Sequence, residues 1–143
     1  MRHLLLTILA IAGVWVAAAQ PAIIPTPQRY TALSGVFTLT SSDNISVVNG
    51  ELLPLADYLA DRLNIGVATD GNITLRLDAS LKAEEYRLSV DADKVEICGG
   101  GYGGVFNGIA TLFQLLPTDV YSTLKLPAHI ACCSVEDAPR YDY

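Results

Sequence analysis

Residues Val95–Leu116 read VEICGGGYGGVFNGIATLFQLL. A short apolar strand is followed by a cluster of glycines and then by the apolar period of an amphipathic helix. Gly99, Gly101 and Gly104 also match the G-x-G-x-x-G spacing of a dinucleotide-binding turn. Whether this stretch binds a dinucleotide determines which fold class the sequence predicts and which functions remain possible.

The residues before the glycine cluster argue against dinucleotide binding. Tyr86–Val90 alternates apolar and polar residues, and Asp91–Lys94 then forms a turn that leads into the glycine-bearing strand. This pattern predicts a β-hairpin, whereas the dinucleotide fold needs a parallel β-α-β unit and an acidic residue about 20 positions later at a strand end. Asp119 has about that spacing but follows a proline in an expected loop. We interpret the glycines as a sharp turn that lets the helix pack close to the sheet.

Helical periodicity occurs in residues 51–64 and 103–116. Pro54 has to lie in the first turn of the earlier helix because it has no N–H, and Asn64 is a suitable residue to end that helix. The later helix is expected to turn Val105, Ile109, Leu112, Leu116, Phe106 and Phe113 toward the core and Asn107, Thr111 and Gln114 toward solvent.

Strands are predicted where apolar and polar residues alternate between turn residues. Residues 20–34 contain three prolines and no period, so we expect an extended lead-in before the first strand. One apolar face per strand indicates a sheet covered on one side only. The sequence therefore predicts an α+β fold: a mixed, largely antiparallel sheet with two amphipathic helices packed on one face. The expected strands are residues 35–40, 44–49, 73–77, 86–91, 95–98 and 129–135.

Residues 1–19 have the pattern of a secretory signal peptide. A short basic start precedes the apolar run Leu4–Val16, and Ala17–Ala19 satisfies the small-x-small cleavage rule. The run is shorter than a membrane span of about 20 residues, although an N-terminal anchor helix is the alternative. Cleavage would leave an exported chain that starts near Gln20 and would change the formal charge from −6 to −7, because Arg2 is lost. Without a basic stripe, this acidic chain is expected to bind neither nucleic acid nor, after cleavage, a membrane.

No catalytic constellation is found in the sequence. His129 is the one histidine after residue 19, and its apolar neighbours favour a structural role. The sequence has no H-E-x-x-H, P-loop or Cys/His cluster, so no catalytic, cofactor-binding or metal-ligating residue is assigned. Three acidic pairs lack the apolar surroundings that would raise a carboxyl pKa, and we interpret them as surface or linker charge. They are Asp57 with Asp61, Glu84 with Glu85, and Glu136 with Asp137.

The cysteines and two sequons leave alternatives open. An exported chain can form a disulfide, but Cys132 and Cys133 should point to opposite faces of a strand, so only one could reach Cys98. The odd number of cysteines favours buried free thiols. Asn44 and Asn72 each begin an N-x-[ST] sequon, a pattern short enough to occur by chance.

Three segments together resemble the secreted family 20 β-N-acetylhexosaminidases. Residues 23–40 (IIPTPQRYTALSGVFTLT) resemble the opening of their N-terminal non-catalytic domain. Residues 84–90 and 95–117 are similar to the end of that domain, where a glycine-rich turn enters a helix close to G-x-x-T-L-x-Q-L-L. Residues 135–143 (VEDAPRYDY) resemble the link into the catalytic barrel, a strand that ends in D-x-P-R-[FY]. The matching positions are Gly108, Thr111, Leu112, Gln114, Leu115, Leu116, Asp137, Pro139, Arg140 and Tyr141.

After the signal peptide that the sequence pattern predicts at residues 1–19, the resemblance implies a zincin-like domain without a metal motif at 20–135 and the start of a linker at 136–143. It implies a catalytic (β/α)₈ barrel in cis, a glycan substrate for the parent enzyme, and no cofactor. The implied reaction removes terminal N-acetylhexosamine with retention: the 2-acetamido oxygen attacks, a Glu protonates the leaving oxygen, and an Asp steadies the oxazolinium. Those carboxylates and a sugar-binding arginine are expected beyond Tyr143, so no catalytic residue is carried over.

Two other readings remain open from the sequence. One is a stand-alone secreted carbohydrate-binding or interaction module, for which Tyr102 is the best candidate for an exposed stacking aromatic. The other is the leading domain of a different glycosidase family, such as the α-glucuronidases or the family 84 enzymes. If a barrel packs against this domain, an exposed apolar patch should mark where it docks.

Overall fold

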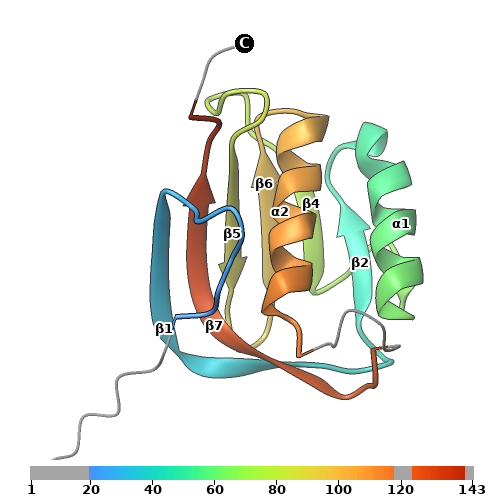
Figure 1. Ribbon diagram of the computed structural model, residues 1–143. Coiled ribbons are helices and arrows are strands. Elements are labelled where there is room, and N and C mark those ends of the chain that lie inside the picture. Colours follow the sequence, from blue (N-terminus) through green and yellow to red (C-terminus); the bar gives the residue numbers. More distant parts are fainter. Residues whose placement is uncertain (1–19, 118–123, 141–143) are drawn as a thin grey trace, which may run out of the picture.

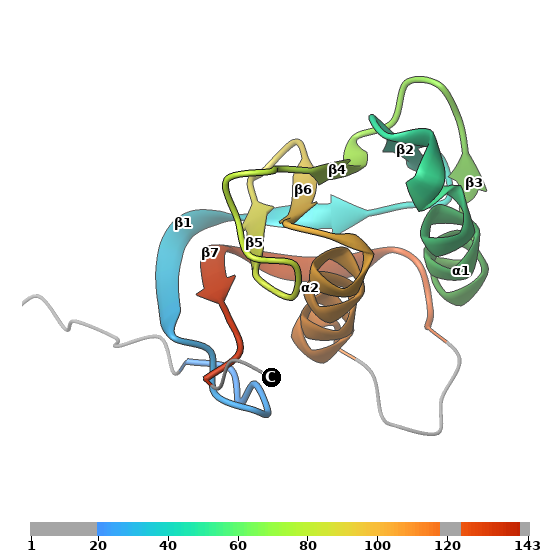
Figure 2. The same ribbon diagram turned by 90° about the horizontal axis from the view of Figure 1, so that it is seen from above.

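A seven-stranded mixed sheet carries both helices on one face (Figures 1 and 2). The computed structural model describes residues 20–117 and 124–140; residues 1–19, Asp119 and the final part of the expected linker lie outside the described residues. The strands lie in the order β1-β7-β5-β6-β4-β2-β3, which confirms the predicted α+β class. Their bounds are β1 Arg29–Leu39, β2 Asn44–Val47, β3 Gly66–Val67, β4 Ile73–Leu77, β5 Tyr86–Val90, β6 Val95–Gly99 and β7 Ala128–Asp137, with helices α1 Leu53–Leu63 and α2 Tyr102–Leu115.

The sheet has an antiparallel half and a parallel half. β1 pairs with β7, β7 with β5, and β5 with β6, all antiparallel. β4 pairs with β6, and β2 with both β4 and β3, all parallel. The parallel pairing of β2 with β3 follows from α1, because the helix that connects these two strands returns the chain to the same end of the sheet. The two-residue strand β3 at that edge was not predicted, since two residues carry no alternation.

Helix α1 forms for the reasons expected from its sequence. Pro54 lies in its first turn, and Asn64 ends it in the left-handed conformation with φ 56°. A short 3₁₀ turn, Gly50–Leu52, precedes the helix. Its apolar stripe lies in the core: Leu52, Leu55, Leu59 and Leu63 are all buried.

Strands β1 and β7 bend together at a corner. β1 starts at Arg29, inside the segment expected to be a lead-in, and its register with β7 shifts between Ala32 and Val36. Gly35 at this shift has φ 109°, a conformation that only glycine adopts without strain. Beyond the corner both strands run beneath the helices (Figure 1) and bring Phe37 into the core.

Both vicinal cysteines, which alternation places on opposite faces of the strand, are buried. Cys133 belongs to the hydrophobic core cluster, and Cys132 lies beside Gly35 at the corner. Both thiols and that of Cys98 are free, in line with the interpretation from their odd number. Burial raises the pKa of Cys98, and it raises the pKa of Cys133 to about 11.

Helix α2 and strand β7 depart from expectation in detail. Thr111 was expected to face solvent but is buried, whereas Phe106 was expected to widen the buried stripe and is 46% exposed. Both residues lie at the borders of the helical stripe, where periodicity does not determine whether a side chain faces the core or solvent.

β7 extends through Glu136 and Asp137, so both residues belong to the sheet where a linker was expected.

Candidate functional site

The acidic pairs and the histidine have structural surroundings. Asp57 and Asp61 are exposed on the outer side of α1. His129 is exposed on β7, where its Nδ1 lies 3.1 Å from Thr38 Oγ1 on the neighbouring strand. Glu136 lies between two arginines, with its carboxylate 3.1 Å from Arg29 and 3.8 Å from Arg87. Within residues 20–117 and 124–140, no three His, Cys, Asp or Glu side chains are grouped so that they could hold a metal ion.

The glycine turn is filled by the chain itself. The amide of Gly104 donates to the carbonyl of Ala83 at 3.1 Å, and that of Gly100 donates to Glu85 at 3.0 Å. A Cβ at Gly104 would collide with the carbonyl of Glu85, so loop and helix backbones approach without room for a side chain. A phosphate would need the same space and the same N–H groups. The hairpin pairing of β5 with β6 and this filled turn confirm the structural interpretation of the glycines.

Glu84 and Glu85 belong to the same loop. The Glu84 carboxylate lies against Gly103 in the first turn of α2 and accepts a hydrogen bond from Asn107 Nδ2 at 3.3 Å. A negative charge there is favourable next to the positive end of the helix dipole. Glu85 Oε2 accepts from the amide of Lys82 at 3.0 Å. The Glu84 carboxylate therefore holds the loop on the helix, and the Glu85 carboxylate closes the loop on itself. The sequence pattern did not reveal either role.

A strap, defined as Ile24–Gln28, connects α2 to the end of β7. Gln114 clamps it, because its Oε1 accepts from the Ile24 amide at 2.7 Å and its Nε2 donates to the Ile24 carbonyl at 3.1 Å. Gln28 donates its amide to Asp137 Oδ1 at 3.2 Å and its Nε2 to the carbonyl of Ala138 at 3.1 Å. Arg140 also donates to the Thr26 carbonyl at 3.3 Å. Three positions of the family motif, Gln114, Asp137 and Arg140, therefore hold the strap in place.

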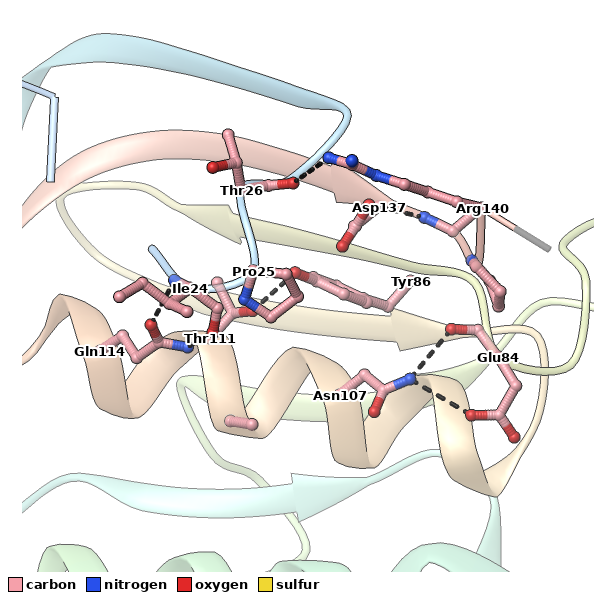
Figure 3. Close-up of a pocket in the computed structure, with 13 residues that line it drawn as sticks. Ile24, Pro25, Thr26, Glu84, Tyr86, Asn107, Thr111, Gln114, Asp137 and Arg140 are labelled. Carbon is pink, nitrogen blue, oxygen red and sulfur yellow. Dashed lines mark hydrogen bonds between the residues drawn. The ribbon is translucent and has the colours of Figure 1, made fainter. Parts of the chain in front are cut away.

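A groove of about 400 Å³ lies between the strap, α2 and the residues after β7 (Figure 3). Tyr86 lies in the groove, and its hydroxyl hydrogen-bonds the buried Thr111 hydroxyl at 2.6 Å. Burial raises the pKa of Tyr86. Ile24, Pro25 and Ala110 supply apolar walls, while Glu84 and Asn107 form one polar end. Apolar walls with a few polar groups at the ends are the usual lining of a binding groove.

An aromatic face covers the outer surface of the two helices. We define it as Tyr58, Tyr102, Phe106 and Phe113. The Tyr58 ring centroid lies 6.2 Å from that of Phe106 and 6.0 Å from that of Phe113, so the side chains bridge α1 and α2. Tyr58, Tyr102 and Phe106 are 41%, 50% and 46% exposed. Arg62 adds a cation 5.5 Å from the Phe113 centroid. This exposed apolar patch agrees with the expectation for a docking surface.

The sequon asparagines take part in a local network. Asn72 Nδ2 donates to Asp43 Oδ1 at 2.7 Å, and the backbone amide of Asn44 donates to Asn72 Oδ1 at 3.4 Å. These contacts connect β2 to the turn before β4, which gives Asn72 a structural role. Among the described residues, neither helix has the length and apolar character needed to cross a bilayer.

The fold and its surfaces define an α+β domain that presents a groove and an exposed aromatic face. Comparison with known proteins assigns this domain to a family. Residues 20–138 match the family model described as glycosyl hydrolase family 20, domain 2. The chain therefore belongs to this family of domains.

Relatives and solved structures show how much of a protein this domain represents. A β-hexosaminidase of Porphyromonas gingivalis is 35% identical, with 85% of this chain and 18% of that protein covered. A β-hexosaminidase of Vibrio furnissii is 31% identical, with 88% and 21% covered. The structure of the Streptomyces plicatus N-acetyl-β-hexosaminidase matches with a TM-score of 0.76 at 32% identity, covering 83% of this chain and 26% of that one. The chain spans about one fifth of the length of these curated relatives.

Proposed function

We propose that this chain is the non-catalytic scaffold domain of an exported β-N-acetylhexosaminidase. The parent enzyme would remove terminal N-acetylhexosamine residues from glycans by retaining, substrate-assisted hydrolysis. The observation that carries the proposal is a family 20 domain fold whose described residues lack any catalytic constellation and which spans 18% of a hexosaminidase. Catalysis would then reside in a barrel in cis, and export would follow from the signal peptide expected at residues 1–19.

The aromatic face supports the proposal that a barrel packs on the helix side. It presents exposed rings from both helices, whereas the opposite side of the sheet carries charged pairs such as Arg76 with Glu96 at 3.0 Å. An apolar surface of this kind is costly in water unless another surface covers it. The groove is lined by other residues of the same helix, Asn107, Ala110, Thr111 and Gln114.

The activity test compares this chain with the protein extended by its downstream sequence. Hydrolysis of an aryl N-acetylglucosaminide is expected only from the extended protein. A chain that ends at Tyr143 and cleaves the substrate at the same rate would disprove the scaffold role.

The docking test uses Phe106→Glu, which places a charge in the aromatic face. It should lower the unfolding temperature of the extended protein and leave that of the isolated chain nearly unchanged, because Phe106 is half exposed there. Asp57→Lys, on the outer side of α1, is the charge-change control. An equal loss of stability in both proteins would assign Phe106 to the core of this domain.

A second candidate is a carbohydrate-binding module. It is favoured by Tyr102, which is 50% exposed at the first turn of α2 beside Phe106, because exposed rings stack on sugar faces. Calorimetric titration with N-acetylglucosamine oligosaccharides would decide. Binding by the isolated chain that is lost in Tyr102→Ala would support this function, and no binding would leave the scaffold role.

A further inference from the structure

We propose that the open face of the sheet, on the side away from both helices (Figure 2), binds an acidic polysaccharide whose chain runs across the strands. The site is an arginine row, which we define as Arg29, Arg87 and Arg76. The polysaccharide we infer alternates a uronic acid with an N-acetylhexosamine. The N-acetylhexosamine rests on the function proposed above, whereas the carboxylates rest on the arginine row alone.

The strand register places the three arginines in one line. Arg29 on β1 and Arg87 on β5 both lie opposite Glu136 on β7, from its two sides. Arg87 and Arg76 in turn both lie opposite Cys98 on β6. Cys98 is buried, which leaves its two arginine neighbours as the exposed groups at this point of the row. Successive arginines are therefore two strands apart, which is about 9.5 Å at the usual strand spacing.

Two glutamates orient the guanidinium groups. Arg76 Nε lies 3.0 Å from Glu96 Oε1. Arg87 Nε and Arg29 Nη1 lie 3.8 and 3.1 Å from the carboxylate of Glu136. A guanidinium group has five N–H donors, so each arginine keeps donors for a second carboxylate, which it can bind in a bidentate manner. The side chains of Arg29 and Arg87 are 71% and 51% exposed, against 39% for both glutamates, so the cations offer more surface to an incoming anion.

The spacing of the arginines selects the kind of polyanion. Two strand spacings are about as long as one disaccharide of an extended β-linked polysaccharide. A uronic acid at every second sugar would therefore bring one carboxylate to each arginine in turn. A nucleic acid strand carries its charges about 3.4 Å apart, which does not match the row, and the net charge of −6 opposes binding of so dense a polyanion.

Hydroxyl groups beside the arginine row suit the sugar rings. Thr31 and Ser89 each lie two residues from an arginine of the row, so their side chains point to the same face of the sheet. Ser134 lies between them in the register. A hydroxyl both donates and accepts hydrogen bonds, which matches the hydroxyl and acetamido groups of an N-acetylhexosamine. The face thus offers cations to the carboxylates and uncharged polar groups to the sugars between them.

The acidic groups of the open face limit the affinity. Asp78 follows β4, and its Oδ1 accepts from the Ser80 amide and hydroxyl at 2.9 and 2.6 Å, so its own loop holds this carboxylate. Glu96 and Glu136 lie in the row itself and repel a carboxylate. We therefore expect weak binding at each arginine, a gain from contact with all three at once, and a loss of affinity as ionic strength rises.

The first test is a nuclear magnetic resonance titration of the chain with a hyaluronan hexasaccharide, which carries three carboxylates. Arg87→Gln removes the central cation and should weaken binding about fivefold. Lys94→Gln in the β5–β6 turn is the matched control, because it removes the same charge from an exposed position outside the row. No binding by the parent chain, or equal weakening in both variants, would overturn the proposal.

Glu96→Gln should strengthen binding, a gain that a loss of structure does not mimic. The glutamine can still accept from Arg76 but no longer repels a carboxylate, so the affinity should rise about twofold. An unchanged or lower affinity would contradict a carboxylate bound at this end of the row.

Two further probes separate the charge of the ligand from its sugar rings. Chitohexaose, an uncharged hexamer of N-acetylglucosamine, and hexaglutamate, an acidic peptide, should both bind more weakly than the hyaluronan hexasaccharide. Equal binding of chitohexaose would overturn the role of the arginines. Equal binding of hexaglutamate would assign the face to an acidic protein partner and overturn the polysaccharide.

The same titration with the protein extended by its downstream sequence separates this proposal from the proposed function. Binding should persist there, and Arg87→Gln should leave the hydrolysis of an aryl N-acetylglucosaminide unchanged. Loss of binding in the extended protein would overturn the proposal, because another part of the protein would then cover the face. Binding without any hydrolysis would support the open face as a site and count against the proposed function alone.

Discussion

The two halves of this domain are held together in different ways. Strands β2, β3 and β4 with helix α1 form a local unit within residues 44–77, in which β2 pairs with β3 and β4 and α1 packs on β2 and β3. β4 also joins this unit to β6 of the other half. The antiparallel half around α2 depends on distant partners, such as Ile24 with Gln114, 90 residues apart, and Gln28 with Ala138, 110 residues apart. In the α1 half, buried aliphatic side chains provide the stability. In the α2 half, close backbone contacts and hydrogen bonds between residues distant in the sequence contribute in addition.

Gly104→Ala should break the α2 half most severely. The added Cβ would collide with the carbonyl of Glu85, a backbone atom that cannot rotate away, so we expect a loss of about 3 kcal/mol in unfolding free energy. Chemical denaturation measures it. Gly50→Ala, next to α1, is the matched control, because nothing lies within 4 Å of its added Cβ and the change should stay within about 0.5 kcal/mol. Equal effects at both glycines would contradict the contrast between the halves.

Tyr86→Phe should have the next largest effect. It removes a buried hydroxyl that bonds Thr111 at 2.6 Å and leaves the Thr111 hydroxyl without this partner, at a cost on the order of 2 kcal/mol. A double-mutant cycle with Thr111→Val measures the interaction energy of the two hydroxyls. The double variant should lose less unfolding free energy than the sum of the losses in the two single variants. Strict additivity would show that the hydroxyls do not interact.

Alkaline pH should weaken the antiparallel half through Cys133. Its pKa is raised from 9.0 to about 11 by burial, so the folded protein keeps a proton that the unfolded chain releases. Stability is thus nearly unaffected at pH 8 and falls as pH rises from 9 toward 11, by about 1.4 kcal/mol at pH 10. Denaturation at pH 8 and pH 10 measures the difference. It should shrink in Cys133→Ala; an unchanged difference would exclude this thiol as the cause.

Asn64 at the end of α1 should give the smallest effect. With φ at 56°, Asn64→Ala should cost about 1 kcal/mol and Asn64→Gly less than about 0.5 kcal/mol, since only the alanine side chain opposes this conformation. Thermal unfolding of both variants measures it. A loss in Asn64→Gly as large as that in Asn64→Ala would point to a side-chain contact instead of the backbone.

The local half was the easier one to predict from the sequence. The leucine stripe, Pro54 in the first turn and the left-handed Asn64 all follow from rules that involve neighbouring residues, and all are confirmed. The β5–β6 hairpin was predicted for the same reason. Strand β3 was missed because its two residues are defined only by their partner β2.

The distant half could be predicted only in outline. Gln114 matches a family motif, but nothing near it in the sequence indicates that its partner is the backbone of Ile24. The groove combines residues from both ends of the described chain, so no single window contains it. The corner at Gly35 likewise required the register between β1 and β7, which lie far apart in the sequence.

The pairing of Gln28 with Asp137 and Ala138 has a mechanical consequence. Because β1 begins and β7 ends side by side, with Arg29 opposite Glu136, tension applied between residues 28 and 138 acts on one end of an antiparallel ladder. In this geometry the hydrogen bonds of the ladder break one after another from the loaded end, instead of sharing the force as they would under shear. The hydrogen bonds between β1 and β7 would therefore break before force acted on the aliphatic core. A force applied between residues 28 and 138 would separate the strap from β7 before it acted on α1.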